Sequence, residues 1–177
     1  MTGGLICRGA AVAVVISLTI SGALALGEKA AAELKDKAGN VVGRIELAEA
    51  SGGVLLKIKL KGLSPGPHGL RIHDAGKCEG DFAGAGEIYN PLGAKYGFLN
   101  EDGPMAGELP NIYVGSNGEM EAELLNHFIT LGKETEEPLL DSDGASILIF
   151  EKAGDHLSEP EGNAGARIAC GVIAPSK

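Results

Sequence analysis

Short runs in which apolar and polar residues alternate limit the fold of this chain more than any other feature. Residues 56–60 and 119–126 alternate cleanly. A period of two is typical of a β-strand that buries one face and exposes the other. The predicted strands cover residues 41–49, 54–60, 68–73, 109–114, 119–126, 145–150 and 167–173. Seven or eight short strands with hairpin turns predict an all-β domain, either an antiparallel sandwich or a Greek-key barrel.

Two segments between the predicted strands are too irregular to be simple turns. Residues 74–107 carry glycine and proline throughout and show no periodicity, and residues 151–166 form a second irregular loop. A loop as long as the first one inside a compact domain is usually functional. We therefore expect the first loop to carry a function, either present or lost.

The strand at residues 68–73 bears the residues of greatest chemical interest. In a strand, Arg71 and His73 point to one face, while Leu70 and Ile72 point to the other together with His68. Two imidazoles at His-x-His spacing could hold one metal ion from a single strand face. Here a guanidinium, which stays charged and cannot ligate a metal, occupies the first of those positions.

The N-terminus has the pattern of an export signal. Residues 1–8 carry one positive charge, residues 10–20 are apolar or small, and Ala23-Leu24-Ala25 has the small-x-small pattern of a cleavage site. We predict a signal peptide over residues 1–25 and a mature domain over residues 26–177, exported to the periplasm or secreted. The alternative is an uncleaved N-terminal anchor.

Composition narrows the class of partner. The net charge is −9, and the loss of Arg8 with the signal would make it −10. Such an acidic chain is a poor partner for nucleic acid or for an anionic membrane surface. We therefore expect no nucleic-acid partner, and no membrane association after the signal is cleaved.

The cysteines agree with export. Cys7 lies in the predicted signal, so Cys78 and Cys170 form the one pair of the mature chain. In an oxidising compartment the simplest interpretation of such a pair is a disulfide. Two free thiols, or a pair that binds a metal, are the alternatives.

Several long motifs resemble the copper–zinc superoxide dismutases of the exported bacterial type. The resemblance covers nearly all of the mature chain and rests on residues 63–70, Cys78, residues 89–91, 107–111 and 162–173. It implies an eight-stranded Greek-key β-barrel, immunoglobulin-like in its sandwich arrangement, with two long loops and one disulfide. It also implies a copper site of four histidines and a zinc site of three histidines and an aspartate, with one histidine shared.

Most of the metal ligands implied by the resemblance are replaced. The six histidine positions fall on Arg71, His73, Ile88, Tyr96, Met105 and Phe150, and the zinc aspartate falls on Glu108. One imidazole of six remains, which is too few to hold copper, because such sites need about three or four protein donors. We therefore expect no bound metal, no cofactor and no catalytic residue, and a vestigial site at Arg71, His73, Ile88, Phe150 and Arg167.

The replacements suggest how the site is filled. Ile88, Phe150, Met105 and Tyr96 would pack apolar volume where the family has ions. Arg71 would then need a carboxylate partner, and Glu108 is favoured over Glu87 and Asp155.

Two further residues keep alternative interpretations. Arg167 matches the arginine that guides superoxide in the family, and here it is either part of a remaining anion pocket or a structural arginine that bonds loop carbonyls. His156 is either a solvated loop residue or a displaced ligand beside His73.

Three functions remain open from the sequence. The leading one is a catalytically inactive, metal-free pseudo-enzyme with a binding or structural role. The second is a dismutase or metal-binding protein with rebuilt ligands from His73, His156, Glu87 and Glu108. The third is an interaction module that docks onto a true dismutase, as the dismutase-like domain of the copper chaperone does; the resemblance thus implies a homodimer or such a heterodimer.

Overall fold

A computed structural model describes residue 1 and residues 28–132 and 138–176. Apart from residue 1, the predicted signal peptide lies outside the described residues. Within the described part of the chain, no helix is long and apolar enough to cross a membrane. The elements are β1 (Lys29–Asp36), β2 (Val41–Ala50), β3 (Gly53–Leu60), β4 (Gly66–His68), β5 (Leu70–His73), the 3-10 turn η1 (Ala83–Ala85), β6 (Ile112–Val114), β7 (Met120–Asn126), β8 (Ser146–Phe150), β9 (Arg167–Val172) and β10 (Ala174–Pro175).

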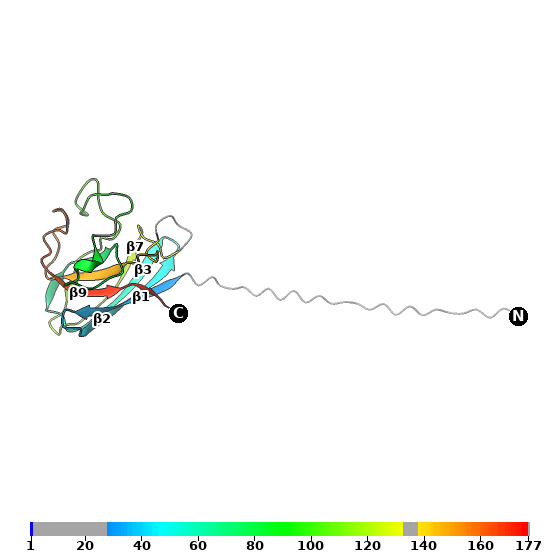
Figure 1. Cartoon of the computed structure of the whole chain (residues 1–177), viewed down its shortest axis with the longest axis horizontal. Coiled ribbons are helices and arrows are strands. Elements are labelled where there is room, and N and C mark those ends of the chain that lie inside the picture. Colours follow the sequence, from blue (N-terminus) through cyan, green and yellow to red (C-terminus); the bar gives the residue numbers. More distant parts are fainter. Residues whose placement is uncertain (2–27, 133–137, 177) are drawn as a thin grey trace.

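The predicted all-β class is confirmed. Eight antiparallel strands form one curled sheet in the order β5-β8-β9-β1-β2-β3-β7, and β10 pairs with β1 (Figure 1). β4 and β6 form a separate two-stranded sheet. β9 pairs with β1, so the last long strand of the chain lies next to the first in the middle of the sheet.

The period-two pattern gave the buried faces correctly. In β3, Leu56, Ile58 and Leu60 are buried, whereas Lys57 and Lys59 are exposed. Buried apolar residues of β2, β3, β5 and β8 share one apolar core, to which β5 and β8 contribute Leu70, Ile72, Ile147 and Ile149. Leu148 and Phe150 of β8 face the other way and belong to a second, smaller cluster. The apolar core fixes the register of β5, since a shift by one residue would exchange its two faces.

Two details of the predicted strands are wrong. The sequence patterns do not predict strand β1, because its run of three alanines at residues 30–32 does not alternate between apolar and polar. No strand is predicted between residues 60 and 68, yet Gly66 and Pro67 pair with β6 opposite Val114 and Tyr113. Proline is tolerated there because a short edge strand does not require its missing N–H.

The two long loops lie next to each other at one side of the sheet (Figure 1). The first long loop runs over residues 74–111 between β5 and β6, a little further than predicted because β6 begins only at Ile112. The second long loop runs over residues 151–166 between β8 and β9. Asn111 joins the two loops, since its side chain bonds the backbone N–H and the carbonyl of Gly154 at 2.9 and 2.8 Å.

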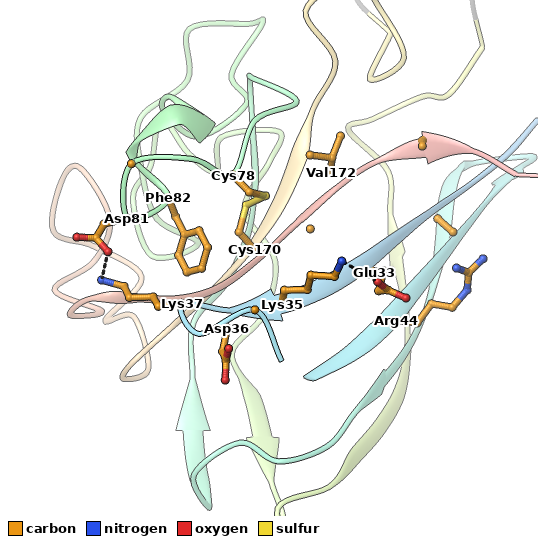
Figure 2. Close-up of a pocket in the computed structure, with 15 residues that line it drawn as sticks. Glu33, Lys35, Asp36, Lys37, Arg44, Cys78, Asp81, Phe82, Cys170 and Val172 are labelled. Atoms are coloured by element: carbon orange, nitrogen blue, oxygen red, sulfur yellow. Dashed lines mark ion pairs between the residues drawn. A yellow bond between two sulfur atoms is a disulfide. The ribbon is translucent and has the colours of Figure 1, made fainter. Parts of the chain in front are cut away.

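The predicted disulfide is present and joins the first long loop to β9. Cys78 and Cys170 are linked across a sequence separation of 92 residues. Figure 2 shows the bond at the wall of a cavity of about 710 Å³ between β1, β9 and the start of that loop. Charged side chains around this cavity pair with one another, as in Lys35–Glu33 at 3.3 Å and Lys37–Asp81 at 3.4 Å.

The length of the closed loop predicts a large contribution to stability. Replacing both Cys78 and Cys170 by alanine should lower the free energy of unfolding by about 4 kcal/mol, because a long loop gains entropy in the unfolded chain. Denaturant titration with and without reductant measures it. Reductant should destabilise the natural protein and leave the double variant unchanged; equal stability of the two oxidised proteins would contradict the prediction.

Candidate functional site

The pairing of β5 with β8 builds a second face opposite the apolar core, on which Arg71 and His73 lie among apolar side chains. Arg71 pairs with Leu148, and the His73 ring stacks against the Phe150 ring with their centroids 6.1 Å apart. The Arg71 guanidinium carbon lies 5.9 Å from the Phe150 ring centroid. As the alternation predicts, Arg71, His73 and Phe150 therefore share a face, while Leu70 and Ile72 join the apolar core.

Backbone bridges from β5 bring the first long loop onto this face. Ile88 pairs with His73, and Glu108 pairs with Arg71. These are the positions at which the sequence predicts the bridging histidine and the zinc aspartate. Residues distant in sequence thus converge where the motifs place the family's metal ligands.

Arg71 is fully buried, and the prediction that it pairs with the carboxylate of Glu108 is wrong. Its Nη1 donates to the Leu70 carbonyl at 2.7 Å and more weakly to the Leu109 carbonyl at 3.4 Å, while Nη2 donates to the Tyr96 hydroxyl at 2.5 Å. No ion pair joins Arg71 to Glu108 or to another carboxylate in the described residues. A phenol and two carbonyls hold the guanidinium instead.

The carboxylate of Glu108 accepts hydrogen bonds from the backbone of the first long loop. Its Oε2 accepts the Gly97 N–H at 2.7 Å and the Met105 N–H at 2.9 Å, which ties two turns of the first long loop to the sheet. Burial raises the pKa of this carboxyl, and the two N–H groups and nearby Arg71 offset part of that rise. Burial also raises the pKa of Tyr96, so its hydroxyl is neutral and accepts the bond from Arg71.

His73 is neutral and has one defined tautomer. Its Nδ1 donates to the Gly86 carbonyl at 3.1 Å, which leaves a lone pair on Nε2. Nε2 is buried, lies 3.9 Å from Glu161 and has no hydrogen-bond partner among the described residues. Burial, followed by the positive charge of Arg167, lowers the pKa of His73 from 6.5 to about 3.

Arg167 has the contacts of the predicted structural arginine. It donates to the carbonyls of Phe82 at 2.9 Å and Gly86 at 3.0 Å, both in the first long loop near the disulfide. Its Nη2 also lies 2.6 Å from the Glu161 carboxylate. Glu161 balances the charge that an anion pocket would need, so this geometry gives an anion little attraction.

Apolar and aromatic side chains fill the rest of the face. Ile88, Tyr96 and Phe150 are buried, as predicted for residues that pack the place of ions. Met105 is half-buried and borders a cavity of about 260 Å³. The other lining residues of this cavity are Glu87, Ile88, Asn90, Pro160, Glu161 and Arg167.

The remaining histidines serve other contacts. The two ring nitrogens of His68 each lie 2.8 Å from a carbonyl oxygen, that of Phe150 and that of Ser64, so this residue braces the end of β8. His156 lies 2.9 Å from the Asn111 amide nitrogen and packs edge-on against Phe98, with ring centroids 5.1 Å apart. Burial and the charge of Arg71 lower the pKa of His156. It is half-buried against the first long loop, and not a solvated loop residue.

Two residues of this site were missed at the level of sequence. Asn111 links the two loops, and the Leu109-Pro110-Asn111 segment was noticed only as part of a motif. At Gly154, a Cβ would collide with Arg71 Nη2 and approach the Tyr96 hydroxyl, so glycine leaves room for the buried guanidinium. No sequence pattern reveals this second requirement, because it depends on the contact between loop and strand.

A curled β-sheet whose two long loops and disulfide enclose the face of β5 and β8 that bears Arg71 and His73 defines the superoxide dismutase-like class of fold. The family model described as copper/zinc superoxide dismutase (SODC) matches residues 41–173, and the chain belongs to this family.

Both enzymes and dismutase-like proteins are among the relatives. The chain is 42% identical over 158 residues to superoxide dismutase [Cu-Zn] 2 of Aquifex aeolicus, covering 88% of this chain and 92% of that one. It is 38% identical to the superoxide dismutase-like protein YojM of Bacillus subtilis, covering 80% and 74%. The crystal structure of a SOD-like protein from Bacillus subtilis superimposes with a TM-score of 0.78 at 37% identity, covering 83% and 98% of the two chains.

The side chains at the family's metal positions do not fit copper and zinc. A guanidinium, an aliphatic side chain and a phenylalanine ring replace three histidines around His73, and none of them can donate an electron pair to a metal. In the described part of the chain, no three His, Cys, Asp or Glu side chains gather into a possible metal site. The buried side-chain atoms without a hydrogen-bond partner among the described residues are Arg71 Nε, His73 Nε2, Glu108 Oε1, Ser146 Oγ and His156 Nδ1. Arg71 Nε is a donor that would repel a cation beside His73.

The hydrogen bonds of Arg71 predict its contribution to stability. Arg71→Met keeps a long apolar side chain but supplies no donor, so the Tyr96 hydroxyl and the Leu70 carbonyl lose their partner. The free energy of unfolding should fall by about 2–4 kcal/mol. Arg44→Met, at an exposed pair with Glu46, is the matched control and should change it by less than about 1 kcal/mol.

Chelator should leave the unfolding transition of all three proteins unchanged. Denaturant titration of the natural protein and the two variants, each with and without chelator, measures these effects. An unchanged midpoint for Arg71→Met would contradict the prediction.

The low pKa of His73 predicts a pH dependence of stability. The unfolded chain binds a proton near pH 6.5, while the folded chain does so only near pH 3. The contribution of neutral His73 to the free energy of unfolding is therefore fully present above pH 6.5. It falls as the pH decreases toward 3, by up to about 1.4 kcal/mol per pH unit. His73→Phe should remove this slope, as measured by denaturant titration at several pH values.

Comparing the pH dependence of the natural protein with that of His73→Phe separates the effect of His73 from those of other groups with shifted pKa values. Glu108, whose raised pKa acts in the opposite direction, is present in both proteins and cancels in the difference. His156 also has a lowered pKa, so His156→Phe is the matched control and should remove a separate part of the slope. Equal slopes for His73→Phe and the natural protein would show that the buried imidazole does not titrate in this way.

Proposed function

We propose that this protein is an exported, metal-free dismutase-like protein that does not dismutate superoxide and acts by binding. The observation that carries the proposal is the buried guanidinium of Arg71, bonded to Tyr96 at the centre of the family's metal region. A fixed positive charge there opposes a metal cation, and it occupies the donor position that a copper ligand would need.

The chemistry of the donor set supports this proposal. Dismutation requires a centre that cycles between two oxidation states, and the side chains on this face have no redox chemistry of that kind. His73 supplies one lone pair, whereas stable copper or zinc sites need about three or four protein donors. Glu108, the one remaining carboxylate of the implied zinc site, is committed through Oε2 to two backbone N–H groups.

A disulfide-stabilised fold supports the proposed export. Disulfides persist in oxidising compartments, and Cys78–Cys170 ties the first long loop to β9. A periplasmic or secreted location agrees with this bond and with the predicted signal. The homodimer and the heterodimer with a true dismutase remain predictions about the partner.

Metal analysis joined to an activity assay tests the proposed function. The purified full-length chain is incubated with copper and zinc and dialysed, and its metal content and superoxide dismutation are then measured. We expect metal content well below one equivalent and no activity above that of the buffer. The Aquifex aeolicus relative, treated in parallel, is the control for loading.

A stable equivalent of copper or zinc would overturn the proposal. It would instead support a metal-binding protein with rebuilt ligands, drawn from His73, His156, Glu87 and Glu108. In that case His73→Ala should release the metal, since His73 Nε2 carries a lone pair and is buried without a hydrogen-bond partner among the described residues, as are Glu108 Oε1 and His156 Nδ1.

A further inference from the structure

Three exposed apolar side chains lie on backbone segments that are side by side where the two long loops touch. Phe98, Leu99 and Leu157 are 41%, 72% and 55% exposed, and we call them the loop patch. The Leu99 N–H donates to the carbonyl of His156 at 3.1 Å, so Leu99 and Leu157 come from backbones that lie side by side. Phe98 packs against the ring of His156. Single exposed apolar residues are ordinary, but a contiguous group marks an interaction site.

Buried hydrogen bonds of Arg71 and Glu108 fix the backbone that precedes the loop patch. Arg71 bonds Tyr96, and Glu108 bonds the N–H of Gly97, so the two residues before Phe98 are fixed to β5 and to the base of the loop. On the second loop, Asp155 accepts the Leu157 N–H at 3.0 Å. A surface that is already ordered loses less conformational entropy when it binds.

Acidic residues flank the loop patch along both loops. Glu101 and Asp102 follow Leu99 closely, Asp155 and Glu159 flank Leu157, and all four are exposed. Hydrogen bonds from Ser158 and from the Leu157 backbone hold the pKa of Asp155 far below its usual range, so it keeps its charge. Lys95, the nearby base, already pairs with Glu159 at 3.8 Å.

We propose that the loop patch is a docking site for a basic protein surface with an apolar centre. An apolar core within a charged rim is the usual anatomy of a protein interface. The acidic rim favours a cationic partner by charge complementarity. A second copy of this chain would bring two acidic rims together, and an anionic lipid surface would meet the same repulsion.

This inference deepens the proposed function, since it names the kind of partner that a protein acting by binding would recognise. It assigns the remodelled interior a role beyond filling space. The bonds of Arg71 and Glu108 fix the backbone that presents Phe98 and Leu99. The position of the loop patch therefore depends on the side chains at positions 71, 96 and 108.

A defined peptide tests the docking site. The probe is a fluorescein-labelled amphipathic peptide of leucine and lysine, and its Kd for the full chain is measured by anisotropy. The double variant Leu99→Ser/Leu157→Ser keeps every charge and should raise Kd by about tenfold or more. Leu125→Ser, on β7 with 47% exposure, is the matched control and should leave Kd unchanged.

The rim is tested separately. Glu101→Gln/Asp102→Asn should weaken binding and reduce its dependence on salt, because it removes two charges of the rim. A peptide in which glutamate replaces every lysine should bind at least tenfold more weakly to the natural protein than the lysine form.

Three results would overturn the docking site. The first is equal affinity of the natural protein and the Leu99→Ser/Leu157→Ser variant for the peptide. The second is self-association in sedimentation that the same double variant abolishes, which would assign the patch to a second copy. The third is patch-dependent binding to phosphatidylglycerol vesicles, which would assign it to lipid. The peptide assay needs no metal, so its failure is distinguishable from failure of the proposed function.

Discussion

The burial of one guanidinium organises the loops of this protein. Arg71 lies on β5 beneath both long loops, and it is fully buried without an ion pair among the described residues. A buried charge is less costly when its donors find acceptors, and here the Tyr96 hydroxyl and the Leu70 carbonyl accept from Nη2 and Nη1, while Nε has no partner among the described residues. Gly154 leaves the space for the contact. The strand and the two loops therefore depend on each other through one side chain.

Sequence patterns predicted the fold well wherever burial alternates. The strands with one buried face, such as β3 and β7, were found because every second side chain is apolar. β1 was missed because alanines at residues 30–32 are all buried and carry no period. Arg71, His73 and Phe150 lie on one face, as the alternation predicts, since a β-register fixes which side chains share a face.

The partner of Arg71 could not be predicted in the same way. Charge alone favours Glu108, and that residue does pair with Arg71 through the backbone. Its side chain nevertheless turns to the N–H groups of Gly97 and Met105, because loop amides also need acceptors when they are buried. Competition of this kind depends on loop geometry, which glycine and proline signals indicate only coarsely.

The replacements have a common physical logic. A metal ion crosslinks a strand and a loop through several ligands at once, and losing it leaves a cavity and loose loop ends. Here Ile88 and Phe150 supply volume, while Arg71, Tyr96 and Glu108 supply directed bonds between β5 and the first long loop. These bonds end at the residues that carry Phe98 and Leu99, so an interior rebuilt for cohesion also fixes a surface. Under the proposed metal-free function, the loops need no open channel to a metal, and their tips are available for the proposed contact with another protein.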